Sequence, residues 1–115
     1  MKEQLLEYLF KKSPVALSYH KAIFDKDGVP YDCEFLDVNN IYESMIGLKD
    51  YEVIGKNYNE IFEIGNVIGD EWKRAFQEAI INNKTVVIDV YNKAVYKWIR
   101  ITIFILDKEH FCLYI

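Results

Sequence analysis

The segment AVYKWIRITIFIL, residues 94–106, constrains the fold most because its side chains alternate in character. Successive side chains of a β-strand point to opposite faces of the sheet. One face of this predicted strand carries only isoleucine, and the other is mixed. The isoleucine face consists of Ile99, Ile101, Ile103 and Ile105, and the mixed face of Trp98, Arg100, Thr102 and Phe104. We expect short helices to cover the isoleucine face. The mixed face is too apolar for open solvent, and we expect an N-terminal helix, from the same chain or a second copy, to cover it.

Turn and periodicity signals predict the elements around this strand. Residues 1–12 carry an apolar stripe of helical spacing and precede Pro14, which indicates an N-terminal helix. Residues 15–25 and 31–38 are rich in strand formers and flank the turn DKDG, where Gly28 is placed to take a positive φ. They form a predicted hairpin, and residues 85–91, 94–106 and 110–115 form a predicted meander.

A string of short helices is predicted between the hairpin and the meander. Their start and stop signals are the capping pairs Asn40 with Glu43 and Asn57 with Glu60, and the helix-ending glycines Gly47 and Gly55. Their expected buried sides are Ile41, Tyr42, Met45 and Ile46, and then Tyr58, Ile61 and Phe62. A longer helix is predicted over about residues 66–81, with Trp72, Ala75, Phe76, Ala79 and Ile80 at helical spacing. The short helices are too short to be stable in water alone, so they must pack on the sheet.

The order of these elements and the composition indicate one α+β domain over residues 1–115, with a core over residues 15–115. The apolar fraction is 51%, and the net charge of -4 comes without a basic run. This charge argues against nucleic acid or an anionic membrane as a partner. No apolar stretch approaches the roughly 20 residues that span a bilayer. Cys33 and Cys112 lie in predicted strands, and the N-terminus does not resemble a signal peptide, so we expect two reduced, buried thiols and a cytoplasmic location.

The chain resembles the PAS family of sensory domains over essentially its whole length. The resemblance rests on DKDGVPYDCEFLDVN, on Asn39 before the short helices, on MIGL and VIGKNYNEIF, and on YNKAVYKWIRI. It looks most like the subset at the N-terminus of bacterial sensor histidine kinases and diguanylate cyclases. The resemblance implies a five-stranded antiparallel sheet in the order 2-1-5-4-3 with a helix-walled pocket on one face. It also implies an N-terminal helix that mediates homodimers and an output domain fused beyond the C-terminus.

These expectations assign three groups of residues. The pocket candidates are His20, Tyr42, Met45, Ile61, Phe62, Trp72, Phe76, Ile88, Ile99, Ile101 and Ile103. The residues with structural roles are Gly28, Asn39, Gly47 and Gly55. The dimer-interface candidates are Leu5, Leu6, Leu9, Phe10, Trp98 and Phe104. Arg100 shares the face of Trp98, so we expect it at an interface and not in the pocket.

No cofactor or metal is expected. Flavin-photosensing PAS domains carry a cysteine in an asparagine-cysteine-arginine motif, and the matching GKNYNEIFE contains none. Haem-binding members supply a histidine from the long helix, which has none here, and a thioester chromophore requires a cysteine outside the strands. His20 either presents its imidazole to a ligand or is a structural or exposed histidine, and His110 is expected to be a solvated turn residue. The two histidines do not form a metal-ligand cluster of recognisable spacing.

Three functions are compatible with this sequence. The first is a sensory PAS domain that binds an unidentified small molecule, homodimerises and regulates an output domain. The second is a dimerisation adaptor without a ligand, which a core packed with aromatic rings favours. The third is a small α+β enzyme, which requires a dyad of His20 with Asp37 or Asp89. The chain has no Gly-rich phosphate loop, HExxH helix or nucleophile elbow, so we expect no enzymatic activity.

Overall fold

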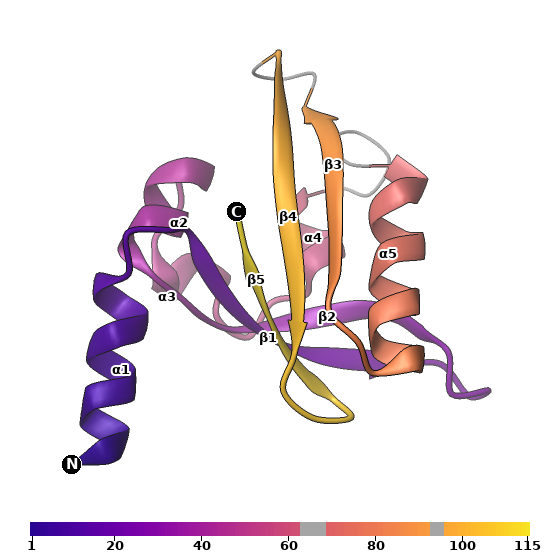
Figure 1. Ribbon diagram of the computed structural model, residues 1–115, viewed down its shortest axis with the longest axis horizontal. Coiled ribbons are helices and arrows are strands. Elements are labelled where there is room, and N and C mark those ends of the chain that lie inside the picture. Colours follow the sequence, from indigo (N-terminus) through magenta and orange to yellow (C-terminus); the bar gives the residue numbers. More distant parts are fainter. Residues whose placement is uncertain (63–68, 93–95) are drawn as a thin grey trace.

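The computed structural model describes residues 1–62, 69–92 and 96–115 (Figure 1). Along the chain, an initial helix is followed by two strands, a group of helices and three further strands. The elements are α1 (Lys2–Lys12), β1 (Leu17–Phe24), β2 (Pro30–Val38), α2 (Asn40–Ile46), α3 (Asp50–Val53), α4 (Tyr58–Phe62), α5 (Gly69–Asn82), β3 (Val86–Asn92), β4 (Lys97–Ile105) and β5 (His110–Tyr114). This order confirms the predicted α+β class.

The strands form one five-stranded antiparallel sheet in the order β2-β1-β5-β4-β3. The β1–β2 hairpin and the β3–β4–β5 meander are both present, and pairing of β1 with β5 joins them. Because the last strand pairs with the first, residues from the two ends of the chain lie side by side in the middle of the sheet. The predicted sheet and its strand order are confirmed.

The start of β4 differs from the sequence prediction. The strand predicted over residues 94–106 begins only at Lys97, because Tyr96 lies in a turn with a φ of 52°, outside the extended region. Its first two predicted residues, 94 and 95, lie outside the described residues. Helix α5 begins at Gly69 within the described chain, so residues 66–68 of the predicted helix also lie outside it.

The alternation of β4 is confirmed except at Thr102, which belongs to the mixed face but is buried. Ile101 and Ile103 are buried and Ile99 and Ile105 partly buried, whereas Trp98 is 71% exposed. The helix that covers this strand was predicted wrongly, because α5 packs against β2, β3 and β4 while α2 packs against β1, and α3 and α4 against β2. The short helices follow β2 directly, and their short connections keep them over the hairpin half of the sheet.

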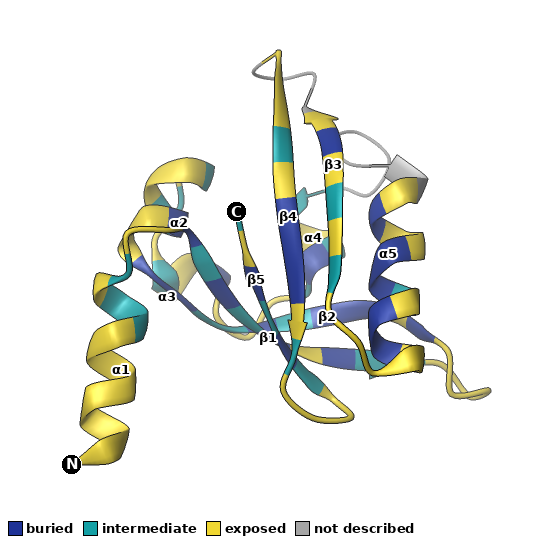
Figure 2. Cartoon of the chain, viewed as in Figure 1, coloured by how far each residue is buried: buried dark blue, intermediate teal, exposed yellow. Residues whose placement is uncertain are grey.

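Helix α1 does not cover the mixed face of the sheet in its own chain. It buries none of its residues, and Leu5, Leu6 and Leu9 are each more than half exposed (Figure 2). In Figure 1 this helix stands beside α2 and α3, away from β4. An ion pair between Lys11 and Asp37 holds its last turn at the end of β2. The prediction that α1 covers the mixed face within its own chain is therefore wrong. That the α1 helix of a second copy covers this face stays a prediction.

The corner between β2 and α2 is organised by Asn39, which is fully buried. Its Oδ1 accepts hydrogen bonds from the amides of Leu17 and Tyr42, both at 3.0 Å, and its Nδ2 donates to the Val15 carbonyl at 2.8 Å. Asn39 is the N-cap of α2, so the prediction that Asn40 is the cap is wrong. The preceding asparagine takes this role because only its amide reaches both β1 and the first turn of the helix.

The predicted buried side of α2 is also only partly correct. Tyr42 is buried and Ile46 is partly buried, whereas Ile41 and Met45 are each 44% exposed. A helix of seven residues at the margin of the sheet presents a single row of side chains to the core, so its neighbouring positions face outward.

The later short helices are fixed by hydrogen bonds at their ends. The carboxylate of Glu43 accepts the Asp50 amide at the start of α3 at 2.7 Å, in place of the predicted box with Asn40. Beyond α3, the amide of Gly55 donates to the Phe35 carbonyl and the amide of Phe35 donates to the Lys56 carbonyl, both at 2.9 Å. This segment therefore runs along the side of β2 that has no neighbouring strand, and it places α4 in the helical layer.

Candidate functional site

A polar cluster lies within the apolar interior between the sheet and the helices. We call Ser18, His20, Cys33 and Tyr42 the inner cluster. The His20 Nε2 lies 2.6 Å from the Ser18 Oγ, and its Nδ1 lies 3.6 Å from the Cys33 Sγ. The Tyr42 hydroxyl is directed toward Ser18, whose hydroxyl counteracts part of the rise that burial causes in the Tyr42 pKa. All four residues are buried, so the cluster joins β1, β2 and α2 through a continuous line of hydrogen-bonding groups.

Strand parity, the register of the hairpin and the first turn of α2 bring these side chains together. Ser18 and His20 are two residues apart on β1, so both point to the helical side of the sheet. A register shift between Tyr19 and His20 pairs His20 with Phe35 of β2, and Cys33 points inward from the same strand. Tyr42 follows the Asn39 cap by three residues and enters the interior from the first turn of α2.

Aromatic rings enclose the imidazole. The His20 ring lies 4.6 Å from the Phe35 ring and stacks on Phe111 at 5.1 Å, measured between centroids. From Phe35 the contacts continue to Tyr58 at 5.8 Å and from Tyr58 to Trp72 at 5.0 Å. These separations are typical of favourable aromatic pairs, so the rings of β2, β5, α4 and α5 form one packed network.

Burial keeps the inner cluster uncharged. Desolvation lowers the pKa of His20 to about 3, so the imidazole is neutral at pH 7. Desolvation also raises the pKa of Cys33 well above its usual value, with the nearby Asp32 carboxylate adding to the shift, and burial raises the pKa of the Tyr42 hydroxyl. The cluster therefore offers neutral hydrogen-bond donors and acceptors and no thiolate.

The dyad required by an enzyme does not form. Asp89 is paired with Arg100 at 2.8 Å on the opposite, outer face of the sheet, and Asp37 is paired with Lys11 at 2.7 Å. In the part of the chain that the structure describes, the groups around His20 are the inner cluster, the backbone of Glu34 and aromatic rings. Among the described residues, no three metal-ligating side chains gather into a cluster.

Most pocket candidates lie in or against the same core. His20 and Tyr42 belong to the inner cluster, and Met45 is exposed and lies apart from it. The remaining candidates are either buried, as are Trp72, Phe76, Ile101 and Ile103, or packed against the core, as are Ile61, Phe62, Ile88 and Ile99.

Sequence reasoning missed several residues of this site. Ser18 and Cys33 complete the inner cluster, and Tyr58 and Phe111 complete the aromatic enclosure. Strand parity could have identified Ser18, because it lies two residues before His20. The packing of Tyr58 against Trp72 depends on how α4 and α5 meet, which has no signal in the local sequence.

The residues expected to be structural occupy turns and corners. Gly28, Gly47 and Gly55 have φ values of 78°, 75° and 87°. At Gly47 this left-handed conformation lets its amide bond the Glu43 carbonyl and end α2, which is costly for a residue with a Cβ. Asn39 lies at the strand-to-helix corner described above.

The outer face of the sheet carries an exposed apolar patch. We define the outer patch as Val87, Tyr91, Trp98, Phe104 and Tyr114, all of which are at least 40% exposed. Tyr91 and Trp98 pack with their ring centroids 5.6 Å apart, and the exposed Asp89–Arg100 ion pair lies between the same two strands. Arg100 is therefore on the face predicted for it.

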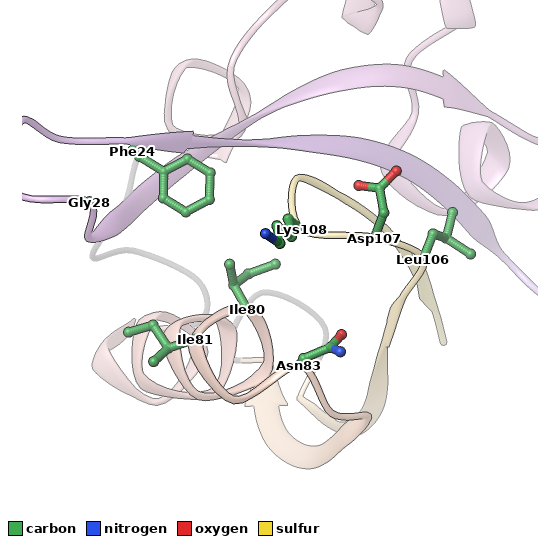
Figure 3. Close-up of a pocket in the computed structure, with 8 residues that line it drawn as sticks. All are labelled: Phe24, Gly28, Ile80, Ile81, Asn83, Leu106, Asp107 and Lys108. Atoms are coloured by element: carbon green, nitrogen blue, oxygen red, sulfur yellow. The ribbon is translucent and has the colours of Figure 1, made fainter.

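A separate groove of about 600 Å³ lies at the end of the molecule where α5 ends (Figure 3). Phe24, Ile80 and Leu106 supply apolar surface, and Asn83 and Lys108 supply polar groups. Asp107 also lines the groove and accepts hydrogen bonds from the amide and Nδ1 of His110, the latter at 2.9 Å. His110 begins β5 and is partly buried, so its prediction as a solvated turn residue is wrong.

The two cysteines differ in burial. Both are free thiols; Cys33 is fully buried as predicted, whereas Cys112 is only partly buried on the outer side of β5. The prediction of two buried thiols is therefore correct for Cys33 alone. No helix in the described ranges is both long and apolar enough to cross a membrane.

Comparison with solved structures identifies the fold. The chain is similar to an RNA-binding light-oxygen-voltage (LOV) receptor, with a TM-score of 0.68 and 17% identity over 98% of this chain and 32% of that one. It is similar to a Rhodobacter sphaeroides LOV protein, with a TM-score of 0.62 and 15% identity over 99% of this chain and 66% of that one.

A third similar structure is the PAS domain of a LuxR-family transcriptional regulator from Burkholderia thailandensis in complex with ethanol. Its TM-score is 0.55 and its identity 18%, over 95% of this chain and 94% of that one. No protein-family model and no curated protein matches the chain. Together with the strand order β2-β1-β5-β4-β3, these similarities show that the chain has the PAS fold. The chain spans about a third of the length of the LOV receptor.

Proposed function

We propose that the chain is a sensory domain that binds a small molecule against the inner cluster and regulates an output domain. The observation that carries this proposal is a line of neutral hydrogen-bonding groups inside an otherwise apolar interior. Tyr42 brings α2 into this line, and Ser18 and His20 bring the central strand β1. Ligand sites typically combine apolar walls with a few well-placed polar groups of this kind.

The proposed mechanism is a shift between two helix positions. A ligand that hydrogen-bonds to Ser18 competes with the Tyr42 hydroxyl for this partner, and so favours a position of α2 farther from β1. Short helices that depend on tertiary contacts are the elements of lowest local stability and move at the least cost. The ligand then selects the displaced state, and the sheet transmits the difference to the chain beyond β5.

The wider setting that we propose follows from the resemblance to PAS domains. The chain would be the N-terminal sensor of a bacterial histidine kinase or diguanylate cyclase, located in the cytoplasm and active as a homodimer. The outer patch and the apolar stripe of α1 supply the surfaces for dimerisation. We propose no haem, flavin or metal cofactor.

Ligand release and thermal shift test the sensing function. Protein purified without added ligand is denatured, its released contents are identified by mass spectrometry, and these and a metabolite library are screened by thermal shift. We expect at least one compound to raise the melting temperature. Tyr42→Phe removes the group that competes for Ser18 and is expected to raise the affinity for this compound about tenfold. Val87→Ala, on the outer face, is the matched control and leaves the affinity unchanged. A library without any stabilising compound would contradict sensing.

A second candidate function is a dimerisation adaptor without a ligand. The direct ring contacts through the inner core favour it, because they fill space that a ligand would otherwise occupy. Leu6→Glu places a charge in the apolar stripe of α1 and is expected to weaken the dimer and alter output activity. Gln4→Glu adds the same charge on the opposite side of the helix and serves as its control. Normal output from a monomeric Leu6→Glu protein would contradict the adaptor function.

A further inference from the structure

The attachment of α1 to the rest of the molecule depends on its last turn. The helix buries no residue, and its exposed body stands apart from the sheet in Figures 1 and 2. At 11 residues it is shorter than the about 12–15 residues that an isolated helix needs in water. A helix of this length needs a tertiary contact to keep both its structure and its direction.

Lys11 makes that contact through two hydrogen-bond acceptors and a more distant carboxylate. Its ammonium lies 2.7 Å from the Asp37 Oδ1, 2.8 Å from the Val38 carbonyl oxygen and 4.0 Å from the Asp50 Oδ2. The side chains of Lys11 and Asp37 are both partly buried. A single cation therefore joins α1 to the end of β2 and to the start of α3.

The two carboxylates near Lys11 are held by different parts of the molecule. The Asp37 carboxylate also accepts the Val38 amide at 2.8 Å, so its position follows β2. The Asp50 carboxylate accepts the Tyr51 amide at 2.7 Å, and the Asp50 amide is bound by Glu43 of α2. A displacement of α2 and α3 relative to β2 changes the distance between the two carboxylates, and the ammonium responds to both.

We propose that Lys11 is a latch that fixes the direction of α1 and makes this direction depend on the positions of α2 and α3. The latch rests on the proposed function in one respect: the displacement of α2 that would open it is the one that we propose a ligand to cause. In the closed state Lys11 binds Asp37 and Val38 with Asp50 nearby. Movement of α3 away removes one carboxylate from the ammonium and lets α1 turn about the end of β2.

Backbone NMR relaxation of the ligand-free chain tests the latch. All variants carry Leu6→Glu, so that no second copy can hold α1. We expect order parameters of about 0.85 for the α1 amides in this background and below about 0.6 after Lys11→Met, which removes the charge and keeps the aliphatic stem. Lys12→Met removes the same charge from the neighbouring exposed residue and is expected to leave the α1 order parameters unchanged.

A second variant separates the two parts of the proposal. Asp50→Asn is expected to leave α1 ordered but to change its residual dipolar couplings relative to those of the sheet. Unchanged order after Lys11→Met would overturn the latch, and unchanged couplings after Asp50→Asn would overturn its dependence on α3. Because neither measurement uses a ligand or a dimer, both results are independent of whether the sensing function is correct.

Discussion

The two faces of the sheet use aromatic side chains in opposite ways. On the inner face, Phe35 and Phe111 are fully buried and enclose a histidine that makes its own hydrogen bonds. On the outer face, Trp98 and Phe104 come from β4, which has a neighbouring strand on each side, and yet they remain exposed. The inner face thus determines the stability of the fold, whereas the outer face is available for association. Substitutions on the two faces should therefore have separable effects.

The largest expected difference between the faces is in packing. Phe35→Ala removes a fully buried ring and is expected to lower the free energy of unfolding by about 3–5 kcal/mol. Phe104→Ala, where the ring is 45% exposed, is expected to cost about 1 kcal/mol or less. Urea unfolding followed by circular dichroism measures both values. Equal losses in the free energy of unfolding at the two positions would show that the two faces contribute equally to stability.

A smaller effect is expected from the protonation of His20. Its pKa is about 3 in the folded chain and about 6.5 when unfolded, so the unfolded state binds the proton more readily. The stabilising contribution is complete above about pH 6.5 and is lost as the pH falls toward 3. Between pH 6.5 and 4 the loss is about 3 kcal/mol, at about 1.4 kcal/mol for each pH unit.

His20→Gln keeps a hydrogen-bonding side chain that does not titrate, and it provides the reference for this prediction. Unfolding free energies of both proteins are measured at several pH values, and the difference between them isolates His20 from the carboxylates. We expect the stability of the variant to fall less steeply below pH 6.5. Parallel pH profiles would mean that the imidazole reaches solvent in the folded state.

The smallest expected effect on folding is at Trp98. Because this side chain is 71% exposed, Trp98→Ser is expected to change the free energy of unfolding of the isolated chain by no more than about 0.5 kcal/mol. If the outer patch forms the proposed dimer, the same change is expected to weaken dimerisation by more than tenfold, as at an aromatic hot spot. Sedimentation velocity measures the dimer. A dimer of unchanged affinity would exclude Trp98 from the interface.

The sequence predicted those features that depend on neighbouring residues. The parity of β4 separated Ile101 from Trp98 correctly, and the turn at Gly28 marked the hairpin. The sheet order was available only through the resemblance to PAS domains. The helix over β4 depends on this order and on the lengths of the connections, and it was predicted wrongly.

Features that depend on distant residues were harder to predict. Asn39 and Asn40 are equally suitable caps by local chemistry, and the backbone groups of Val15 and Leu17 decide between them. In the same way, His20 has Phe35 as its partner on β2 because of a register shift within the hairpin. Neither outcome is encoded in the residues beside it.

The hydrogen bonds that Gly55 and Lys56 make with Phe35 have a consequence for solubility. β2 is an edge strand, and exposed edges with free amides and carbonyls recruit strands from other chains. In the middle of β2 those groups are already occupied by the segment after α3. Within the described chain β3 pairs on one side only, with β4. Ordered aggregation through strand addition should therefore begin at β3, and a lysine at Val87 would oppose it.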